Sequence, residues 1–145
     1  MLYDPSNPVV QLCVKGIETE YSGNLEAANS LYQQAWVLAN NDLEYLTAAH
    51  YLARAQSDPA ETLKWNLLAL EHAGKTKDQD IASFMPSLYL NVAKSHEDLD
   101  NSSKAHDYYL LARQNAGTLE KDGYGNMIRK GIEAGLERIT AKIKK

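Results

Sequence analysis

The sequence predicts an all-α fold of about seven helices, and three observations lead to this class. Apolar residues recur at helical spacing, and the few β-branched residues follow the same period instead of the alternation typical of strands. Helix-capping residues recur along the chain, and the segments between the expected helices are short. With 145 residues, the chain is long enough to bury one core, so we expect a single domain over residues 1–145.

The first two helices are bounded by strong local signals. Asn7 followed by Pro8 is typical of a helix start, because the side chain of Asn7 can cap the helix and proline is tolerated in the first turn. We expect this helix to continue to Tyr21 and to stop at Gly23, a residue that readily adopts conformations a helix excludes. Asn24 then caps the second helix.

The next two helices begin with capping-box spacing. Asn41 is followed three residues later by Glu44, and Asp58 is followed three residues later by Glu61. In each box the first side chain caps the helix and the second reaches back toward the cap. The fourth helix should end near Gly74.

The last three helices carry weaker signals. Pro86 should kink the fifth helix or mark its true start. Asn101 or Ser102 caps the sixth, and the GYG motif at 123–125 is expected to form a tight turn before the seventh. The expected helices cover about residues 8–21, 24–40, 41–56, 58–74, 79–99, 101–117 and 124–143.

The helix pairs repeat along the sequence. A shift of about 34 residues, followed by one of about 43, aligns matching positions in three segments. The matching positions are the helix cap (Asn24, Asp58, Asn101), a small residue (Ala28, Thr62, Ala105), an aromatic position (Tyr32, Asn66, Tyr109) and a second small residue (Ala35, Ala69, Ala112).

This pattern resembles the tetratricopeptide-repeat (TPR) family, whose unit is a 34-residue helix hairpin with small, aromatic and small residues in this order. The second unit departs from it at His50, where glycine or alanine is usual, and at Asn66. The resemblance implies a right-handed α-solenoid of three hairpins, at about residues 9–42, 43–76 and 86–119, closed by a capping helix at about 124–143. Within a hairpin we expect Gly16 to let the second helix approach at Ala28, and Tyr32 to fill the gap to the next hairpin.

Composition excludes several classes of protein. A net charge of −4 argues against a dedicated nucleic-acid binder. The opening residues lack the features of a signal peptide, and no stretch has the roughly 20 apolar residues of a membrane span. One cysteine, Cys13, excludes an internal disulfide. We therefore expect a cytoplasmic protein with no nucleic-acid or membrane partner.

Sequence motifs of catalysis or metal binding are lacking, so we expect no enzyme, no cofactor and no metal. The four histidines lack zinc-site spacing, and no phosphate-binding loop follows a strand. We expect His50 to pack between helices. His96, Glu97 and Asp98 are adjacent, and we interpret them as a solvated face because neighbouring helical residues point in different directions.

The first helix of each hairpin should line the concave side of a solenoid. We therefore predict a groove that binds a protein or peptide segment, with Tyr as a rigid contact surface and Arg or Lys holding a carboxylate. The predicted groove residues are Glu44, Thr47, Tyr51, Arg54, Asn91 and Lys94.

Two alternatives to this adaptor hypothesis stay open. One is a self-associating structural protein, in which exposed Trp36 or Trp65, or the groove itself, binds another copy. The other is a small-molecule-binding helical protein or enzyme with a pocket near Phe84, Met85 and Tyr89, although such residues at helical spacing are usually core.

Overall fold

The structure is a computed structural model that describes residues 4–144, so residues 1–3 and Lys145 of the expected domain lie outside it. The described residues form seven α-helices and one short 3-10 helix, which confirms the all-α prediction. The helices are α1 (Pro8–Tyr21), α2 (Leu25–Leu38), α3 (Asp42–Arg54), α4 (Pro59–Lys75), α5 (Ile81–Asp98), α6 (Ser102–Asn115) and α7 (Gly123–Ile143), and the 3-10 helix covers Ala116–Thr118.

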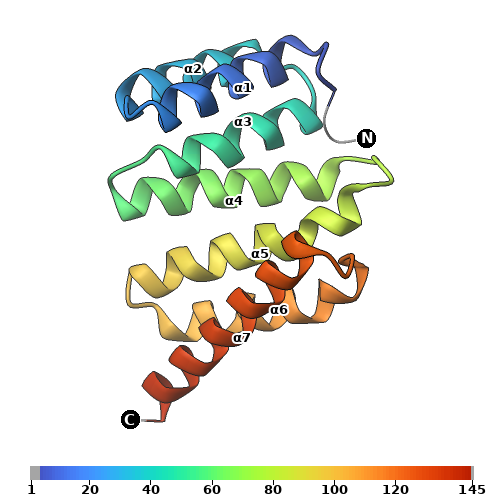
Figure 1. The fold of residues 1–145 in the computed structure, drawn as a ribbon. Helices are drawn as coiled ribbons and strands as arrows, with labels where there is room; N and C mark the ends of the chain where they lie inside the picture. The colour runs from blue at the N-terminus through green and yellow to red at the C-terminus, as the bar shows by residue number, and fades with distance from the viewer. Residues whose placement is uncertain (1–3, 145) are drawn as a thin grey trace. The chain divides into compact units, whose positions relative to one another are not determined.

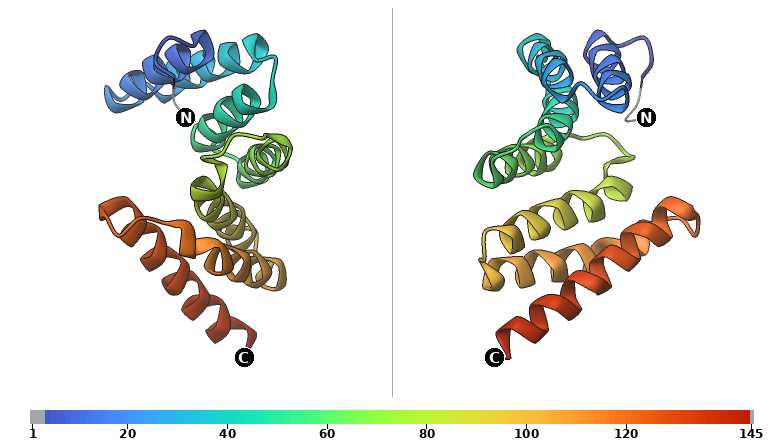
Figure 2. Two further views of the ribbon diagram at one scale, coloured as in Figure 1. Left: turned by 90° about the vertical axis from the view of Figure 1, so that its right-hand side faces the viewer. Right: turned by 60° about the vertical axis from the view of Figure 1, so that its left-hand side comes forward.

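The chain divides into two compact units, Met1–Gln79 and a second that begins at Asp80. In unit 1, α1 packs on α2 and α3 packs on α4, and the two hairpins contact each other through α1, α2 and α3 (Figure 1). In unit 2, α5 packs on α6, and α7 packs on both of them (Figure 2). The helices therefore pair in sequence order, as hairpins do in a TPR fold.

Most of the helix-capping residues are those that the sequence predicts. Asn7, Asn24, Asn41 and Asn101 each accept a hydrogen bond from a backbone N–H in the first turn of the helix that follows. Gly23 adopts a φ of 94°, a left-handed conformation that favours glycine. Local cap chemistry thus sets most helix starts.

Neither reciprocal capping box forms as expected. Asp58 accepts from the N–H of Ala60, and Glu61 lies 3.7 Å from the Lys64 ammonium instead of turning back to the cap. Asn41 does accept from the N–H of Glu44, at 2.9 Å, but the Glu44 carboxylate accepts from the N–H of Asn40, one residue earlier than predicted.

Proline and glycine positions in unit 2 differ from the expectations in detail. Pro86 is buried inside α5, which begins at Ile81 and continues through it, so the alternative that Pro86 marks the helix start is wrong; a kink at Pro86 stays a prediction. The GYG motif forms the first turn of α7, so the prediction of a separate tight turn is wrong. A Cβ atom at Gly125 would lie 2.0 Å from the carbonyl oxygen of Glu120, so glycine is needed there for close approach of the chain.

Glycines admit the two repeated tyrosines into the core. A Cβ atom at Gly16 would lie 2.3 Å from a ring carbon of Tyr32, so Gly16 makes room for this ring. The expected contact partner of Gly16 was Ala28. The ring also stacks on Tyr51 of the next hairpin, with 5.5 Å between centroids. In unit 2, Gly135 of α7 accommodates Tyr109 of α6 in the same way, with a Cβ atom 2.2 Å from the ring.

The second hairpin has different side chains in these places. Asn66 is buried at the position of the tyrosines, and Trp65 beside it is only 8% exposed. The ring of Trp65 contacts Trp36 edge to face, with 5.0 Å between the centroids. The suggestion that Trp65 is exposed for self-association is therefore wrong.

Candidate functional site: the face formed by α1 and α3

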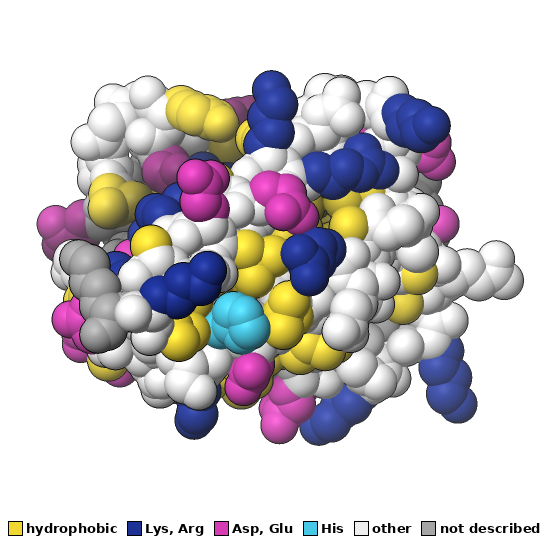
Figure 3. Space-filling view, turned by 90° about the horizontal axis from the view of Figure 1, so that it is seen from below, with side chains coloured by type: hydrophobic (Ala, Val, Ile, Leu, Met, Phe, Trp, Pro, Cys, Tyr) yellow, Lys and Arg dark blue, Asp and Glu magenta, His cyan; other side chains and the backbone are white. Residues whose placement is uncertain are grey.

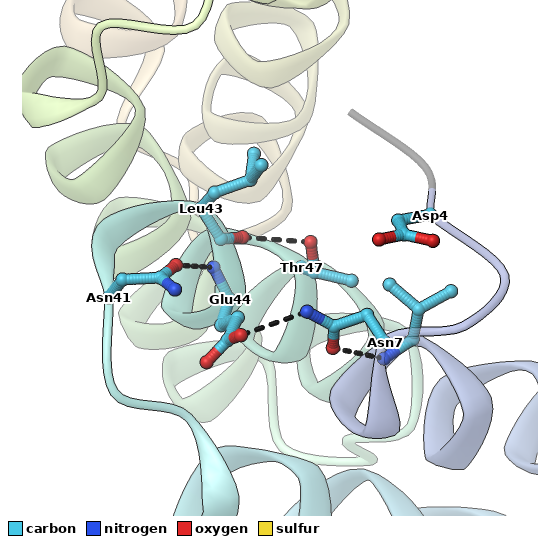
Figure 4. A pocket seen from close by; sticks show the side chains of 7 residues that line it. Asp4, Asn7, Asn41, Leu43, Glu44 and Thr47 are labelled. Atoms are coloured by element: carbon cyan, nitrogen blue, oxygen red, sulfur yellow. Dashed lines mark hydrogen bonds between the residues drawn. The ribbon is translucent and has the colours of Figure 1, made fainter. Parts of the chain in front are cut away.

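Helices α1 and α3 begin side by side in unit 1. The side chain of Asn7 caps α1 by accepting from the N–H groups of Val9 and Val10, at 2.8 and 3.2 Å. Its amide nitrogen donates to the Glu44 carboxylate in the first turn of α3, at 2.9 Å (Figure 4). One asparagine therefore joins the starts of the two helices.

A small pocket of about 60 Å³ lies at this junction and is called here the α1–α3 pocket. Val10 and Leu43 contribute apolar surface, and the carboxylates of Asp4 and Glu44 are also part of its lining (Figure 4). The complete lining is Asp4, Asn7, Val10, Asn41, Leu43, Glu44 and Thr47. A pocket of this size accommodates a side chain of a few heavy atoms.

Two of the predicted groove residues, Glu44 and Thr47, line this pocket. The Thr47 hydroxyl donates to the carbonyl oxygen of Leu43, at 2.8 Å. The Glu44 carboxylate accepts from Asn7 and from the backbone of Asn40, at 2.9 and 3.0 Å. Both side chains are thus held in place by the protein itself before any ligand arrives.

Two more predicted residues, Tyr51 and Arg54, lie at the other end of α3. The Arg54 guanidinium forms a 2.7 Å ion pair with Glu20 of α1 and lies 5.9 Å from the centre of the Tyr51 ring. The same Glu20 carboxylate accepts from the Tyr32 hydroxyl at 2.9 Å. Because α1 and α3 meet at their starts and again near their ends, they run in the same direction.

Arg54 therefore has a structural partner that the sequence analysis did not anticipate. Its side chain is 42% exposed, so it still presents a surface on this face. Nearby, burial and the hydrogen bond to Glu20 raise the pKa of Tyr32, which keeps its hydroxyl protonated as the donor. We call Glu20, Tyr32 and Arg54 the first clamp.

A second clamp in unit 2 joins Glu97, Tyr109 and Arg138. Glu97 accepts from the Tyr109 hydroxyl at 2.6 Å and from two nitrogens of Arg138 at 2.8 and 3.0 Å. The hydrogen bonds from Arg138, and then the bond from Tyr109, hold the pKa of Glu97 down to about 2 against the opposing effect of burial. This clamp attaches α7 to the hairpin of α5 and α6.

The second clamp corrects the interpretation of residues 96–98 as a solvated face. His96 and Glu97 are 6% and 8% exposed, and only Asp98 faces solvent. The His96 ring stacks on Tyr108, with 5.4 Å between centroids. Glu20 and Tyr32 are related to Glu97 and Tyr109 by the same shift of 77 residues, which is the signal that could have revealed both clamps.

The remaining predicted groove residues, Asn91 and Lys94, lie on α5 in unit 2. Lys94 is exposed and pairs with Asp98 one turn later on the same helix. Asn91 is partly buried and has an interaction partner in the structure. Four of the six predicted residues thus lie on α3 in unit 1 and two on α5 in unit 2.

Sequence reasoning missed Asp4, Asn7, Asn41 and Leu43 as pocket residues. Asn7 and Asn41 were identified only as helix caps. Once α1 and α3 are known to be parallel neighbours, their two caps must lie at the same end of the face. Both caps can be recognised in the sequence, but placing them in one pocket requires knowing that α1 and α3 pack in parallel.

Burial shifts the pKa values of two further titratable groups, His50 and Cys13. Burial, followed by the charge of Arg54, lowers the pKa of His50 to about 4. Burial raises the pKa of the Cys13 thiol to about 12, so this thiol is a poor nucleophile. Among residues 4–144, no group of three or more His, Cys, Asp and Glu side chains is placed to hold a metal ion.

None of the helices in residues 4–144 combines the length and apolar character that crossing a membrane requires. On the face shown in Figure 3, Lys and Arg side chains are interspersed with Asp and Glu around a hydrophobic patch. This face therefore lacks the continuous basic surface typical of nucleic-acid binders.

Three sequential helix hairpins with small and aromatic residues at repeat spacing, followed by a packed C-terminal helix, define the tetratricopeptide-repeat fold. The chain has this fold, with three repeats and a capping helix. No protein-family model matches the chain, and no curated protein matches it in sequence.

Two solved structures of PcrH are similar to nearly the whole chain. The crystal structure of PcrH in complex with the chaperone binding region of PopD aligns with 98% of this chain and 98% of its own, with a TM-score of 0.69 and 19% identity. The crystal structure of PcrH from Pseudomonas aeruginosa aligns with 97% of this chain and 98% of its own, with a TM-score of 0.63 and 20% identity. At this level of identity the similarity establishes a shared fold.

Proposed function

We propose that this protein is a non-enzymatic binding module that holds a segment of a partner protein, in the manner of a chaperone. The observation that carries the proposal is the fold shared over nearly the full length with PcrH, which has been crystallised with the chaperone binding region of PopD. Because one fold can host many functions, the geometry of the α1–α3 face is the second support for the proposal.

The α1–α3 face has the features of a preorganised docking surface. It has the α1–α3 pocket at one end and the partly exposed Tyr51 and Arg54 at the other. The groups that line it are fixed by Asn7 and by the first clamp, so little conformational entropy is lost when a ligand binds. An extended segment that places one side chain in the pocket and runs along α3 would use both ends.

We assign Glu44, Thr47, Tyr51 and Arg54 to this contact surface. Asn91 and Lys94, which lie on α5 in unit 2, are proposed separately as ligand contacts of that unit. Thr47 provides the most direct test because it lies on the pocket wall and is only partly buried. Replacing it with arginine blocks the pocket with a larger side chain, and arginine is a better helix former than threonine.

The experiment is affinity purification from the native organism with the wild-type chain, followed by anisotropy titrations with overlapping peptides from the captured partner. We expect one short segment to bind, and Thr47→Arg to weaken that binding at least about tenfold, since loss of a hot-spot contact costs about 2 kcal/mol or more and about 1.4 kcal/mol already corresponds to tenfold. Thr140→Arg, at a partly buried threonine of α7, is the matched control. Equal affinity of wild type and Thr47→Arg would remove the α1–α3 face from the proposal.

Self-association is a second candidate function, favoured by a different surface. Val37 and Leu38 of α2 are 82% and 50% exposed, and they line a shallow hollow together with Leu12 of α1. Burial of such side chains against another copy would be favourable. Light scattering across a range of concentrations tests this candidate, and a constant monomer mass would reject it.

A further inference from the structure

The charge of the α1–α3 pocket limits which segments it can accept. Asp4 and Glu44 contribute two carboxylates, and none of the described residues that line the pocket is basic. Hydrogen bonds from the side chain and backbone of Ser6 hold the pKa of Asp4 below its usual value, so this carboxylate is ionised at neutral pH.

The helix starts only partly offset this negative charge. Each helix N-terminus is equivalent to about half a positive charge, and both α1 and α3 begin at the pocket. Two full carboxylate charges exceed this contribution. The backbone donors are also partly engaged, because Asn7 and Asn41 accept hydrogen bonds from the first turns. The site is therefore net negative.

The shape of the pocket restricts the side chain that enters it. Its volume of about 60 Å³ suits a side chain of a few atoms, and Val10 and Leu43 provide apolar surface. A lysine or arginine buried completely in this space would lose hydration that the already bonded carboxylates replace poorly. A small apolar side chain inside, with a cation outside, satisfies both the volume and the charge.

We infer that the α1–α3 pocket selects partner segments in which a small apolar residue, such as alanine or valine, lies next to a lysine or arginine. The apolar side chain enters the pocket, and the cation lies beside Asp4 and Glu44. This inference rests on the proposed function, because it specifies the ligand of the same face. Complementary charges of this kind contribute more to specificity and association rate than to affinity.

The test uses a random peptide library displayed on phage, selected in parallel against the full chain and against the Asp4→Asn/Glu44→Gln variant. Both substitutions keep the shape and one oxygen acceptor while removing the charge. Asp107→Asn/Glu133→Gln, at two exposed positions in unit 2, is the charge-matched control. If the double variant does not fold, Asp4→Asn alone replaces it, since among the hydrogen bonds of residues 4–144 the Asp4 carboxylate accepts only from Ser6.

We expect peptides selected by the wild type and by the control to be enriched in Lys or Arg next to Ala or Val, and those selected by Asp4→Asn/Glu44→Gln to lose that enrichment. Replacing the basic residue of a selected peptide with glutamine should weaken binding about two- to fivefold at low salt, and less at high salt, as exposed ion pairs do. Peptides that bind the wild type and the double variant with the same basic content would overturn the inference and leave the proposed function intact. Failure to select any peptide whose binding Thr47→Arg weakens would overturn the inference and would also remove the α1–α3 face from the proposed function.

Discussion

The guanidinium of Arg138 on α7 makes two hydrogen bonds to the carboxylate of Glu97 on α5, at 2.8 and 3.0 Å. Glu97 is only 8% exposed, whereas the Arg138 side chain is 46% exposed. The pair is therefore asymmetric, because one charge is desolvated and depends on the other. This asymmetry allows the clamp that holds α7 to be tested by removing the exposed partner.

Replacing Arg138 with methionine should destabilise unit 2 by roughly 2 kcal/mol. Loss of one member of a fully buried pair costs about 3–5 kcal/mol and an exposed pair contributes up to about 1 kcal/mol, so a half-exposed arginine lies between them. Urea denaturation provides the measurement, and Arg113→Met, at an exposed position of α6, is the control. Equal stability of Arg138→Met and Arg113→Met would contradict a stabilising clamp.

The same substitution in the first clamp should have a smaller effect. Arg54→Met leaves Glu20 with the Tyr32 hydroxyl, and Glu20 is 18% exposed and better hydrated than Glu97. We expect a loss of about 1 kcal/mol, within the range for accessible ion pairs. A larger loss of stability for Arg54→Met than for Arg138→Met would show that the exposure of the carboxylate does not decide which clamp contributes more.

Stability should fall in two stages as the pH is lowered. The pKa of His50 is about 4 in the fold against a usual 6.5, so the folded state disfavours its protonation. Its contribution is complete above pH 6.5 and is lost as the pH falls toward 4. The pKa of Glu97 is about 2 against a usual 4.5, so its contribution is complete above 4.5 and is lost between 4.5 and 2.

Urea midpoints measured from pH 7 to pH 3 check this order. In His50→Gln the decline between pH 6.5 and 4 should become shallower, because the glutamine does not titrate. In Glu97→Gln the fold should be less stable at pH 7, but the decline below pH 4.5 should be reduced. An unchanged slope in either variant would remove that residue from the explanation of acid sensitivity.

The glycines that face the two tyrosines should resist substitution by alanine. An exposed helical Gly→Ala change usually stabilises a protein by up to about 1 kcal/mol, and Gly74 of α4 has no atom within 4 Å of an added Cβ. At Gly16 and Gly135 the added Cβ would lie 2.3 and 2.2 Å from a tyrosine ring. We expect Gly74→Ala to raise the melting temperature, and the other two changes to cost about 1–3 kcal/mol through overpacking.

Thermal melts of the three single variants distinguish packing from propensity. If Gly16→Ala and Gly135→Ala were as stable as Gly74→Ala, the tyrosine rings would not be held against these helices. Tyr32→Leu combined with Gly16→Ala should recover part of the loss, because a smaller side chain makes room for the new methyl group.

Local signals were sufficient to predict the helices, because caps and periodicity act over a few residues. Asn7, Gly23 and Asn101 have the predicted roles. The Glu97–Arg138 pair could not be predicted from such local signals. It joins residues 41 positions apart, and the register of α7 on α5 has to be known before the two can be paired.

The candidate site shows the same division. Glu44 and Thr47 were predicted from helical spacing, which places them on the inner face of the first helix of their hairpin. Asp4 belongs to the segment before the first repeat, so no repeat position could identify it. The negative charge of the pocket could therefore be identified only from the structure, whereas the helices that form the pocket could be predicted from the sequence.

The hydroxyl of Tyr109 tests whether the second clamp acts as one network. It donates to Glu97 at 2.6 Å and accepts from Arg138 at 3.3 Å, so it contacts both charged groups. Tyr109→Phe keeps the ring against Gly135 and removes only the hydroxyl, and it should cost about 1.5–3 kcal/mol, the range for a hydrogen bond to a charged group.

In a double-mutant cycle that combines Tyr109→Phe with Arg138→Met, the two losses of stability should differ from additivity by more than about 0.5 kcal/mol, as expected for groups that share a partner. The cycle is measured by urea denaturation at pH 7, with Tyr32→Phe and Arg138→Met as the control pair, because Tyr32 belongs to the first clamp and makes no hydrogen bond to Arg138 among those found in residues 4–144. Additive losses for Tyr109 and Arg138 would mean that the two groups hold Glu97 independently, and the description of a single clamp would then be wrong.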